Sequence, residues 1–448
     1  MIKVNTPISK ADYYGIIDAV EKGESGFSVI IDCVESESFD NRYIKNNGSI
    51  LELITKIPNL LIKVDLSPNE FKTFLGIGNI SKLEGRWLKV FKSKNRISKI
   101  YKSKSISNYS NNVPLIEDSN YSFQLINGRK GNDRTLLNWL RGGFNLGVSC
   151  AEYVKQEEAL LKLDSIDFGG HQSLNLITYN VGQGNACCVN NGDFPLFYFD
   201  IGGGANFNHF TYPVPRVFNH SPYNIIVLSH WDEDHYETAR RSYYLQSEFT
   251  FIAPVQHVTP RNLKFIAELI SHGANLLLLP RTFVSHTFSV GTLKRCIGNN
   301  YSKNNCGLAL HLKFQKEDDI SSVLLPGDAQ YKYIPNIQNE EFDGLIASHH
   351  GGRLTLPRTM PNTLVENGCI VYSYGDNNIY GHALQNTITC HELNYWGNNA
   401  GQSVNRRDTL DGDVLMSYFA NDGNCCVNEA NKLTNHFPKN SSIETQPK

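Results

Sequence analysis

The sequence of 448 residues lacks any segment that would place it in or across a membrane. Its first residues, Met1–Asn5, contain no apolar stretch followed by small residues, so they do not indicate a secretory signal. The longest apolar runs, such as Leu276–Leu279, have the length of a strand and fall far short of the roughly 20 residues of a transmembrane helix. We therefore expect no membrane partner and a cytoplasmic location.

No Cys-x-x-Cys pair occurs among the ten cysteines, and neither sign of charge is in large excess. Neighbouring cysteines such as Cys187 and Cys188 would point to opposite faces of a strand, so the spacing does not indicate a disulfide framework. We expect reduced, partly buried thiols. The formal net charge of −2 excludes a field that would draw the whole molecule to nucleic acid or to a lipid surface.

The length predicts two domains, because 448 residues exceed what one ordinary core holds. Residues 1–165 carry no catalytic motif and are predicted to form a mixed α+β domain. From 172 to 425, short apolar strands alternate with turns and a few helices, which favours two packed sheets flanked by helices. Residues 426–448 are polar and are predicted to form a C-terminal tail. Predicted helices cover 146–163, 260–272 and 382–396.

The stretch from Lys82 to Lys104 is basic, with Glu84 as its one acidic residue, and aromatic residues are interleaved with the basic ones. Such a pattern can follow a phosphate backbone and stack bases, which makes three residues near its centre candidates for nucleic-acid binding: Lys92, Lys94 and Arg96. The alternative is an ordinary solvated strand face beside a small core, and the sequence alone favours this alternative.

Four potential metal ligands stand within six residues at the end of an apolar strand, Asn224–Leu228. His230 and Asp232 are two residues apart, so they project to the same side of an extended chain and can hold one ion. A turn after them would let Asp234 and His235 face a second ion nearby.

Further histidines and an aspartate follow other apolar runs. Val323–Leu325 leads to Asp328, and Leu345–Ala347 leads to His349 and His350. A fourth run is followed by His382. One histidine at a strand end is usually structural, but several strand ends carrying histidine and aspartate in this order indicate a metal site.

The motif His-x-Asp-x-Asp-His, with Gly-Asp and His-His-Gly downstream, resembles that of the metallo-β-lactamase fold superfamily, and is closest to the metallo-hydrolase domain of ComEC-type competence proteins. The resemblance covers 172–420 and includes the family's opening motif at Asn180–Ala186. In this motif, Asn180 and Asn185 replace the two aspartates of the family. It implies an α/β fold, a four-layer αββα sandwich of the metallo-β-lactamase type, with an additional N-terminal mixed α+β domain.

The resemblance also implies roles for single residues. The ligands would be His230 and Asp232 for one ion, Asp234, His235 and His350 for the other, and Asp328 as the bridge. Asp200 would orient a ligand histidine. Asp234 would be essential to catalysis, and His349 and His382 would touch the substrate or protonate the leaving group. The third ligand of the first ion stays open among His257, His272, His286 and the segment Asn304–Gly307.

The implied activity is that of a metal-dependent hydrolase, a phosphodiesterase or nuclease in which two divalent ions, zinc or manganese, activate a hydroxide. One alternative is a small-molecule phosphodiesterase that acts on a cyclic nucleotide or a choline-type phosphoester. Another is a regulatory or binding module whose metals only stabilise the fold. In either case the N-terminal domain is a candidate for contact with a protein partner.

Overall fold

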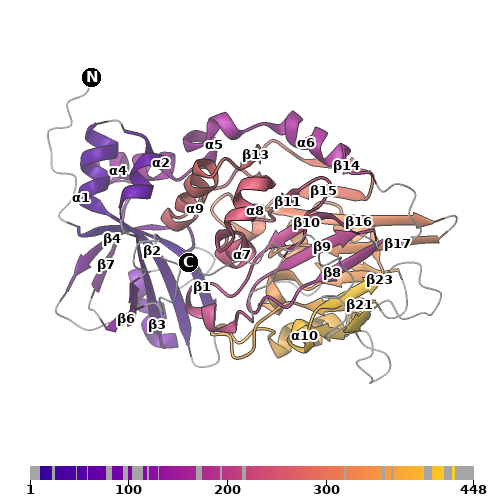
Figure 1. The fold of residues 1–448 in the computed structure, drawn as a ribbon. Helices are drawn as coiled ribbons and strands as arrows, with labels where there is room; N and C mark the ends of the chain where they lie inside the picture. Colours follow the sequence, from indigo (N-terminus) through magenta and orange to yellow (C-terminus); the bar gives the residue numbers. More distant parts are fainter. Residues whose placement is uncertain are drawn as a thin grey trace. The chain divides into compact units, whose positions relative to one another are not determined.

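The computed structural model describes most of the chain as two compact units (Figure 1). The first unit lies within 1–151 and 257–271, and the second within 152–256 and 272–445. The described residues are 11–22, 26–46, 48–57, 59–76, 83–93, 99–102, 115–118, 121–129, 131–167, 174–191, 194–213, 218–316, 319–354, 359–364, 368–397, 406–417 and 426–428.

The first unit is built on an antiparallel sheet of seven strands in the order β6-β5-β3-β2-β1-β4-β7. Val29 and Ile31 alternate along one face of the sheet and join a buried cluster with Ile62 and Val64. Gly15 lies against this face, where a Cβ would be 2.7 Å from the Ile31 side chain, so no larger residue fits. The strands are β1 (Tyr13–Lys22), β2 (Phe27–Glu35), β3 (Asn59–Leu66), β4 (Trp87–Lys92), β5 (Lys99–Lys102), β6 (Leu115–Asp118) and β7 (Tyr121–Leu125).

The last helix of the first unit, α9 (Pro260–Ser271), comes from the part of the sequence that lies between strands of the second unit. Its first turn is held by Asp32 of β2, whose Oδ2 accepts a hydrogen bond from the backbone N–H of Arg261 at 2.8 Å. The helix predicted at 260–272 is thereby confirmed. The other helices of this unit are α1 (Ser36–Ser38), α2 (Ile50–Lys56), α3 (Pro68–Thr73), α4 (Gly131–Gly143) and α5 (Leu146–Ser149), with a π-helix at Phe39–Lys45.

The second unit contains two large sheets. One has eight strands in the order β13-β12-β11-β10-β9-β8-β23-β24, and the other has seven in the order β14-β15-β16-β17-β19-β21-β22. The strands of the first are β8 (Asn175–Thr178), β9 (Ala186–Asn190), β10 (Pro195–Ile201), β11 (Ile225–Val227), β12 (Thr250–Pro254), β13 (Asn275–Leu279), β23 (Val414–Ser417) and β24 (Cys426–Asn428). Those of the second are β14 (Ser285–Phe288), β15 (Gly291–Arg295), β16 (Leu308–Lys316), β17 (Asp319–Leu325), β19 (Gly344–Ile346), β21 (Cys369–Tyr372) and β22 (Arg406–Asp408). A small parallel pair joins β18 (Glu341–Phe342) and β20 (Asn362–Thr363).

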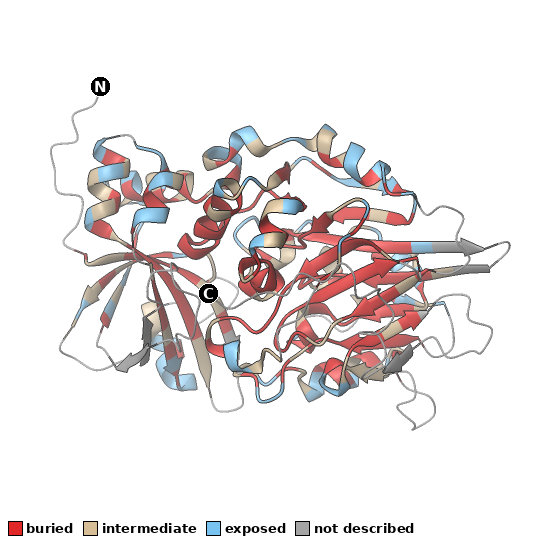
Figure 2. Ribbon diagram, in the orientation of Figure 1, coloured by how far each residue is buried: buried red, intermediate tan, exposed pale blue. Residues whose placement is uncertain are grey.

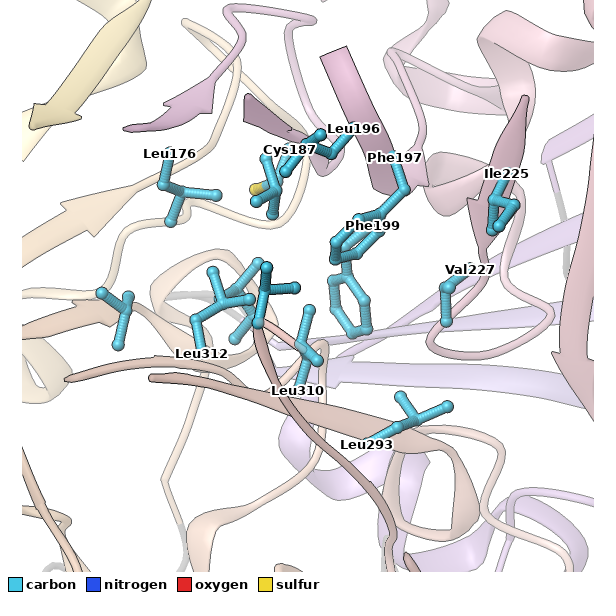
Figure 3. Close-up of a cluster of buried hydrophobic side chains, with 14 of the residues drawn as sticks. Leu176, Cys187, Leu196, Phe197, Phe199, Ile225, Val227, Leu293, Leu310 and Leu312 are labelled. Carbon is cyan, nitrogen blue, oxygen red and sulfur yellow. The ribbon is translucent and has the colours of Figure 1, made fainter. Parts of the chain in front are cut away.

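The main core lies between the two sheets (Figure 3). Phe197 and Phe199 of β10 point into this core and meet leucines of the other sheet, among them Leu310 and Leu312. Tyr198 points to the opposite face, because successive side chains of a strand alternate. Both faces of β10 are buried, which explains why its sequence is apolar throughout rather than alternating.

Helices cover the outer faces of both sheets. On the eight-stranded sheet, α7 (Glu237–Arg240) contacts β10, and Tyr198 packs against Phe249, which follows α8 (Tyr243–Glu248), with ring centroids 6.1 Å apart. On the seven-stranded sheet, Ile388 of α10 (Gln385–Glu392) joins a cluster with Leu324 and Ile370. Figure 2 shows the strands buried along most of their length and the exposed residues gathered on helices and loops. The predicted αββα fold and the additional α+β unit are confirmed.

The helix predicted over 146–163 is wrong as a single element. The chain forms α5, a 3₁₀ turn at Ala151–Tyr153 and then α6 (Gln156–Asp164). Between the turn and α6, the backbone N–H of Lys155 donates to the carbonyl of Leu278 in β13 at 3.2 Å. A tertiary hydrogen bond thus replaces one that a continuous helix would make.

No described helix is long and apolar enough to cross a bilayer. Seven of the described cysteines are free thiols, whereas Cys369 is disulfide-bonded, so the prediction of reduced cysteines holds for the seven and is wrong for Cys369. The cytoplasmic location stays a prediction. The tail predicted from 426 begins with β24, and its residues after 428 lie outside the described part of the chain.

Candidate metal centre

The candidate ligands follow the carboxyl ends of parallel strands in both sheets. In the eight-stranded sheet β11 is parallel to its neighbours and leads into the segment His230–His235, whose last three residues form a 3₁₀ turn. In the other sheet β17 leads to Asp328, and the parallel strand β19 leads to His349 and His350. Carboxyl ends of neighbouring parallel strands lie at one edge of a sheet, where loops can converge on a ligand.

The buried carboxylate of Asp328 stands at the centre of this group. Its Oδ1 lies 3.1 Å from Nε2 of His235 and 3.7 Å from Nε2 of His350. Its Oδ2 lies 3.7 Å from Nε2 of both His230 and His349. These distances bring residues that follow three strands of the two sheets, β11, β17 and β19, to one place.

Two of the imidazoles are oriented through their other ring nitrogen. Nδ1 of His350 is 2.8 Å from the carbonyl oxygen of Ser373, which can only accept, so this nitrogen carries the proton. Nδ1 of His235 is 2.8 Å from Oδ2 of Asp200. In both residues Nε2 is buried and faces a carboxylate oxygen, at 3.1 Å from Asp328 for His235 and 3.2 Å from Asp234 for His350, without the geometry of a regular hydrogen bond. An ion between these nitrogens and carboxylates would bind the lone pair of each Nε2, so these residues fit a divalent metal.

The described residues contain two groups of three side chains that could each hold a metal ion. Within each group, the ligand atoms lie within 4.8 Å of one another. His235 is in both groups, and Asp328 faces members of both. The groups are His230, His235 and Asp328, and Asp234, His235 and His350.

Asp200 contacts His235 on the side of the ring that faces away from Asp328. It is fully buried in a left-handed backbone conformation (φ 58°). Besides contacting His235, it accepts hydrogen bonds from the backbone N–H and Oγ of Ser229 at 2.7 and 2.8 Å, and from Nδ2 of Asn185 at 3.1 Å. An aspartate at 185 would set a second carboxylate against Asp200, so the asparagine at this position suits the observed network.

Asp232 is placed differently from the other candidate ligands. Its Oδ2 lies 3.1 Å from Nε2 of His230, but its Oδ1 forms an ion pair with Nζ of Lys303. Asp232 belongs to neither of the two groups described above. Lys303 could not be predicted from the sequence, because no motif marks it and it is far from Asp232 in the chain.

His349 and His382 line one side of the centre, with ring centroids 5.3 Å apart. Nδ1 of His382 accepts a hydrogen bond from Nε2 of Gln183 at 3.3 Å, so the proton of the neutral ring lies on its Nε2. Burial and the neighbouring imidazoles hold the pKa of His382 well below its usual range, which keeps the ring neutral. A neutral imidazole with an N–H on Nε2 can donate a hydrogen bond from that nitrogen. Gln183, from the opening motif, is thereby part of the site.

Opposite charges dominate the electrostatics of the buried centre. Burial alone would raise the pKa of the Asp328 carboxyl, but His235, His350 and His349 outweigh burial and hold the pKa of Asp328 well below its usual range. Burial likewise works against a charged His235, yet Asp328 and Asp200 raise the pKa of His235 well above its usual value. An ion among these groups would take the place of the His235 proton.

The histidines proposed for the open ligand position lie elsewhere. Nδ1 of His272 is 2.7 Å from Gln246, and Nε2 of His286 is 2.7 Å from Asp164. In the alternative segment, Oδ1 of Asn305 accepts a hydrogen bond from the backbone N–H of Gln330 at 3.0 Å. Among the described residues, His257, His272 and His286 belong to neither ligand group.

The proposed nucleic-acid-binding residues are only partly described. Lys92, at the end of β4, is exposed, and its Nζ lies 5.9 Å from the ring centroid of Tyr13. Lys89 on the same strand forms an ion pair with Asp133 at 2.7 Å, so its charge is compensated. Lys94 and Arg96 lie outside the described residues.

No protein-family model matches the chain. No curated protein matches it either. Among solved structures, it is similar to a diphosphatase of the PhnP family, at 10% identity over 55% of this chain and 98% of the other, with a TM-score of 0.33. It is also similar to MEM-A1, a subclass B3 metallo-β-lactamase from a soil metagenome library, at 12% identity over 39% and 78% of the two chains (TM-score 0.24). A third is the metallo-β-lactamase GOB-18 from Elizabethkingia meningoseptica, at 14% identity over 48% and 88% (TM-score 0.22). No activity is transferred from proteins this distant.

Proposed function

We propose that the second unit is a metal-dependent hydrolase that cleaves phosphodiester bonds, with nucleic acid as its substrate. The observation that carries the proposal is the position of Asp328, whose Oδ1 lies 3.7 Å from Nε2 of His350 in one candidate ligand group and whose Oδ2 lies 3.7 Å from Nε2 of His230 in the other. Two divalent ions about 3.5–4 Å apart repel each other and need a shared anionic ligand. Asp328 fits that requirement.

The remaining ligands divide between two positions on either side of Asp328. Nε2 of His350 and Oδ2 of Asp234 are 3.2 Å apart, and with His235 they form one position. His230 and Asp232 form the other. Three imidazoles with three carboxylates suit zinc or manganese and argue against magnesium alone. When bound, two such ions lower the pKa of a water to roughly 7 and offset charge on phosphoryl oxygens.

The chain itself supplies a hydrogen-bond donor for the leaving group in this proposal. His382 is neutral and bears its proton on Nε2, because Gln183 donates to Nδ1. His349, whose Nε2 is 3.7 Å from Asp328, lies beside it. Either ring can contact a phosphodiester that approaches Asp328, and His382 can donate a hydrogen bond from Nε2 to the departing oxygen, which takes its proton from solvent water.

Nucleic acid is proposed as the substrate on two grounds. The motifs around His230, Asp328 and His350 resemble those of ComEC-type competence proteins, in which a bridging carboxylate fits phosphoester cleavage better than lactam opening. The first unit adds the basic stretch, in which Lys92 is exposed. We propose that Lys92, Lys94 and Arg96 contact the phosphate backbone.

A substrate panel tests the proposal. The full chain, stripped of metal, is incubated with manganese or zinc and then with single- and double-stranded DNA, RNA, a cyclic nucleotide, a choline phosphodiester and bis-p-nitrophenyl phosphate. We expect metal-dependent cleavage of at least one nucleic acid and of the nitrophenyl diester. Cleavage of the small diesters alone would contradict nucleic acid as the substrate. Absence of all cleavage with either metal would contradict the enzyme and leave a metal-stabilised binding module.

A further inference from the structure

Lys303 brings a buried positive charge to the edge of the candidate metal centre. The residue is 9% exposed and immediately precedes the 3₁₀ turn Asn304–Cys306. Its Nζ forms an ion pair with Oδ1 of Asp232, whose other oxygen lies 3.1 Å from Nε2 of His230. The ammonium group therefore binds a carboxylate that would otherwise be free to hold an ion beside His230.

The backbone around Lys303 is fixed against the ligand segment by one buried side chain. Nε2 of Gln256 donates to the carbonyl oxygen of Lys303 at 2.7 Å, and Oε1 of Gln256 accepts from the backbone N–H of Trp231 at 3.3 Å. Trp231 stands between His230 and Asp232 in the sequence. Gln256 is completely buried, so these hydrogen bonds are shielded from water. Lys303 is thus held in place rather than being a mobile surface lysine.

The other ion position has no such competitor within the described part of the chain. Among the described residues, Asp234 forms ion contacts with His235 and His350, at 3.9 and 3.2 Å, and with no lysine or arginine. The two halves of the centre therefore differ in charge. One half holds a carboxylate already paired with an ammonium group, and the other holds a carboxylate paired only with imidazoles.

We propose that Lys303 and a divalent ion compete for Asp232, so that the two positions fill one after the other. This inference rests on the metal centre proposed above. The position of Asp234, His235 and His350 fills first. The position of His230 and Asp232 fills only when the metal concentration is high enough to displace the ammonium group, because a fixed like charge a few ångströms away repels the incoming ion. At low metal concentration Lys303 neutralises Asp232 in place of the ion.

The test counts bound metal and does not depend on activity. The metal-free full chain is dialysed against rising free Mn²⁺, and bound manganese is measured by inductively coupled plasma mass spectrometry. The wild type should bind two equivalents in two steps whose dissociation constants differ by at least about tenfold. Lys303→Met should bring the steps together, mainly by tightening the weak one.

Four further variants assign and control the effect. Lys303→Arg keeps the positive charge and should keep the two steps apart, and Lys303→Gln should repeat the effect of Lys303→Met. Lys313→Met removes an exposed lysine of β16 and should change nothing. His230→Ala should abolish the weak step and leave the tight one. Circular dichroism verifies that each variant is folded.

The possible outcomes separate this inference from the proposed function. The competition would be overturned if the wild type bound both equivalents with the same affinity. It would also be overturned if the ratio of the two dissociation constants were unchanged in both Lys303→Met and Lys303→Gln. Either result would leave the proposed hydrolase intact. A protein that binds no manganese at any concentration would overturn the proposed metal centre itself. The competition would be established if the two binding steps merged in Lys303→Met and Lys303→Gln but stayed apart in Lys303→Arg and Lys313→Met.

Discussion

Asp200 and His235 form a hydrogen bond of 2.8 Å between Oδ2 and Nδ1 in the interior of the second unit, and neither side chain is exposed. Asp200 comes from the end of β10, and His235 from the turn after β11. The contact directs Nε2 of His235 toward Asp328. Asp200 thus connects β10 of the eight-stranded sheet to the candidate metal site through His235.

We predict that Asp200→Asn weakens binding of the tightly held metal by about 10- to 100-fold, the usual effect of removing a partner that orients a ligand histidine. The variant keeps the shape of the side chain but loses the negative charge opposite Nδ1. Equilibrium dialysis against manganese measures the change. Unaltered affinity in a folded Asp200→Asn protein would show that this hydrogen bond does not support metal binding.

We predict that the stability of the first unit depends on pH through the buried carboxyl of Asp32. Burial raises the pKa of its carboxyl to about 7, with Arg261 as the main opposing influence, whereas the ordinary value is 3.8. The folded state therefore holds a proton that the unfolded state has already released. Stability should be highest below pH 4 as far as Asp32 is concerned, and should fall as the pH rises toward 7, by up to about 4 kcal/mol.

Asp32→Asn removes this titration and retains an oxygen that can accept from the N–H of Arg261. We expect the variant to be more stable than the wild type at pH 8, and the difference to shrink toward pH 4. Urea unfolding followed at several pH values measures it. A difference that does not vary with pH would contradict a raised pKa for Asp32.

The basic stretch predicts a salt effect. Neutralising Lys92, Lys94 and Arg96 together should weaken binding of DNA or RNA and reduce the slope of log affinity against log salt concentration by about three at most, because each phosphate contact releases about one counterion. Fluorescence anisotropy with a labelled oligonucleotide measures both quantities.

A matched control is the triple replacement of three exposed lysines in the same unit, which removes the same charge: Lys45, Lys56 and Lys72. We expect it to leave the slope nearly unchanged. Equal slopes for the wild type and the Lys92, Lys94 and Arg96 variant would show that the basic stretch is an ordinary solvated strand face.

The ligand set predicts a metal preference. Asp232 stands where the usual motif of the superfamily that the sequence resembles has a histidine, and carboxylate oxygens suit manganese better than imidazole nitrogens do. We predict that manganese activates the stripped protein better than zinc, although zinc binds more tightly in the Irving–Williams order. Adding back each metal alone, with occupancy and phosphodiester cleavage measured together, decides the matter. Full activity with zinc and none with manganese would show that Asp232 does not set the preference.

The sequence predicted most of the candidate centre because its ligands follow apolar strands. His230, Asp234 and His235 lie within six residues, and Asp328 and His350 each come shortly after a buried run, so the pattern is visible without a structure. The parallel pairing of β17 and β19 then brings the separate strand ends to one place.

Other parts of the centre could not be predicted, because they depend on packing between distant segments. Gln256 and Lys303 are 47 positions apart and meet only in the folded chain. For the same reason α9 could be predicted as a helix but not as part of the first unit, to which Asp32 of β2 connects it.

The central claim is that Asp328 joins two metal positions in a phosphodiesterase. The most direct measurement compares the initial rate of bis-p-nitrophenyl phosphate cleavage by the wild type and Asp328→Asn, both stripped and reloaded with manganese. Removal of the shared carboxylate should lower the rate at least about a hundredfold in a protein with an unchanged circular dichroism spectrum, since even partners outside the ligand set contribute 10- to 100-fold. Turnover by Asp328→Asn at a rate close to that of the wild type would contradict the account.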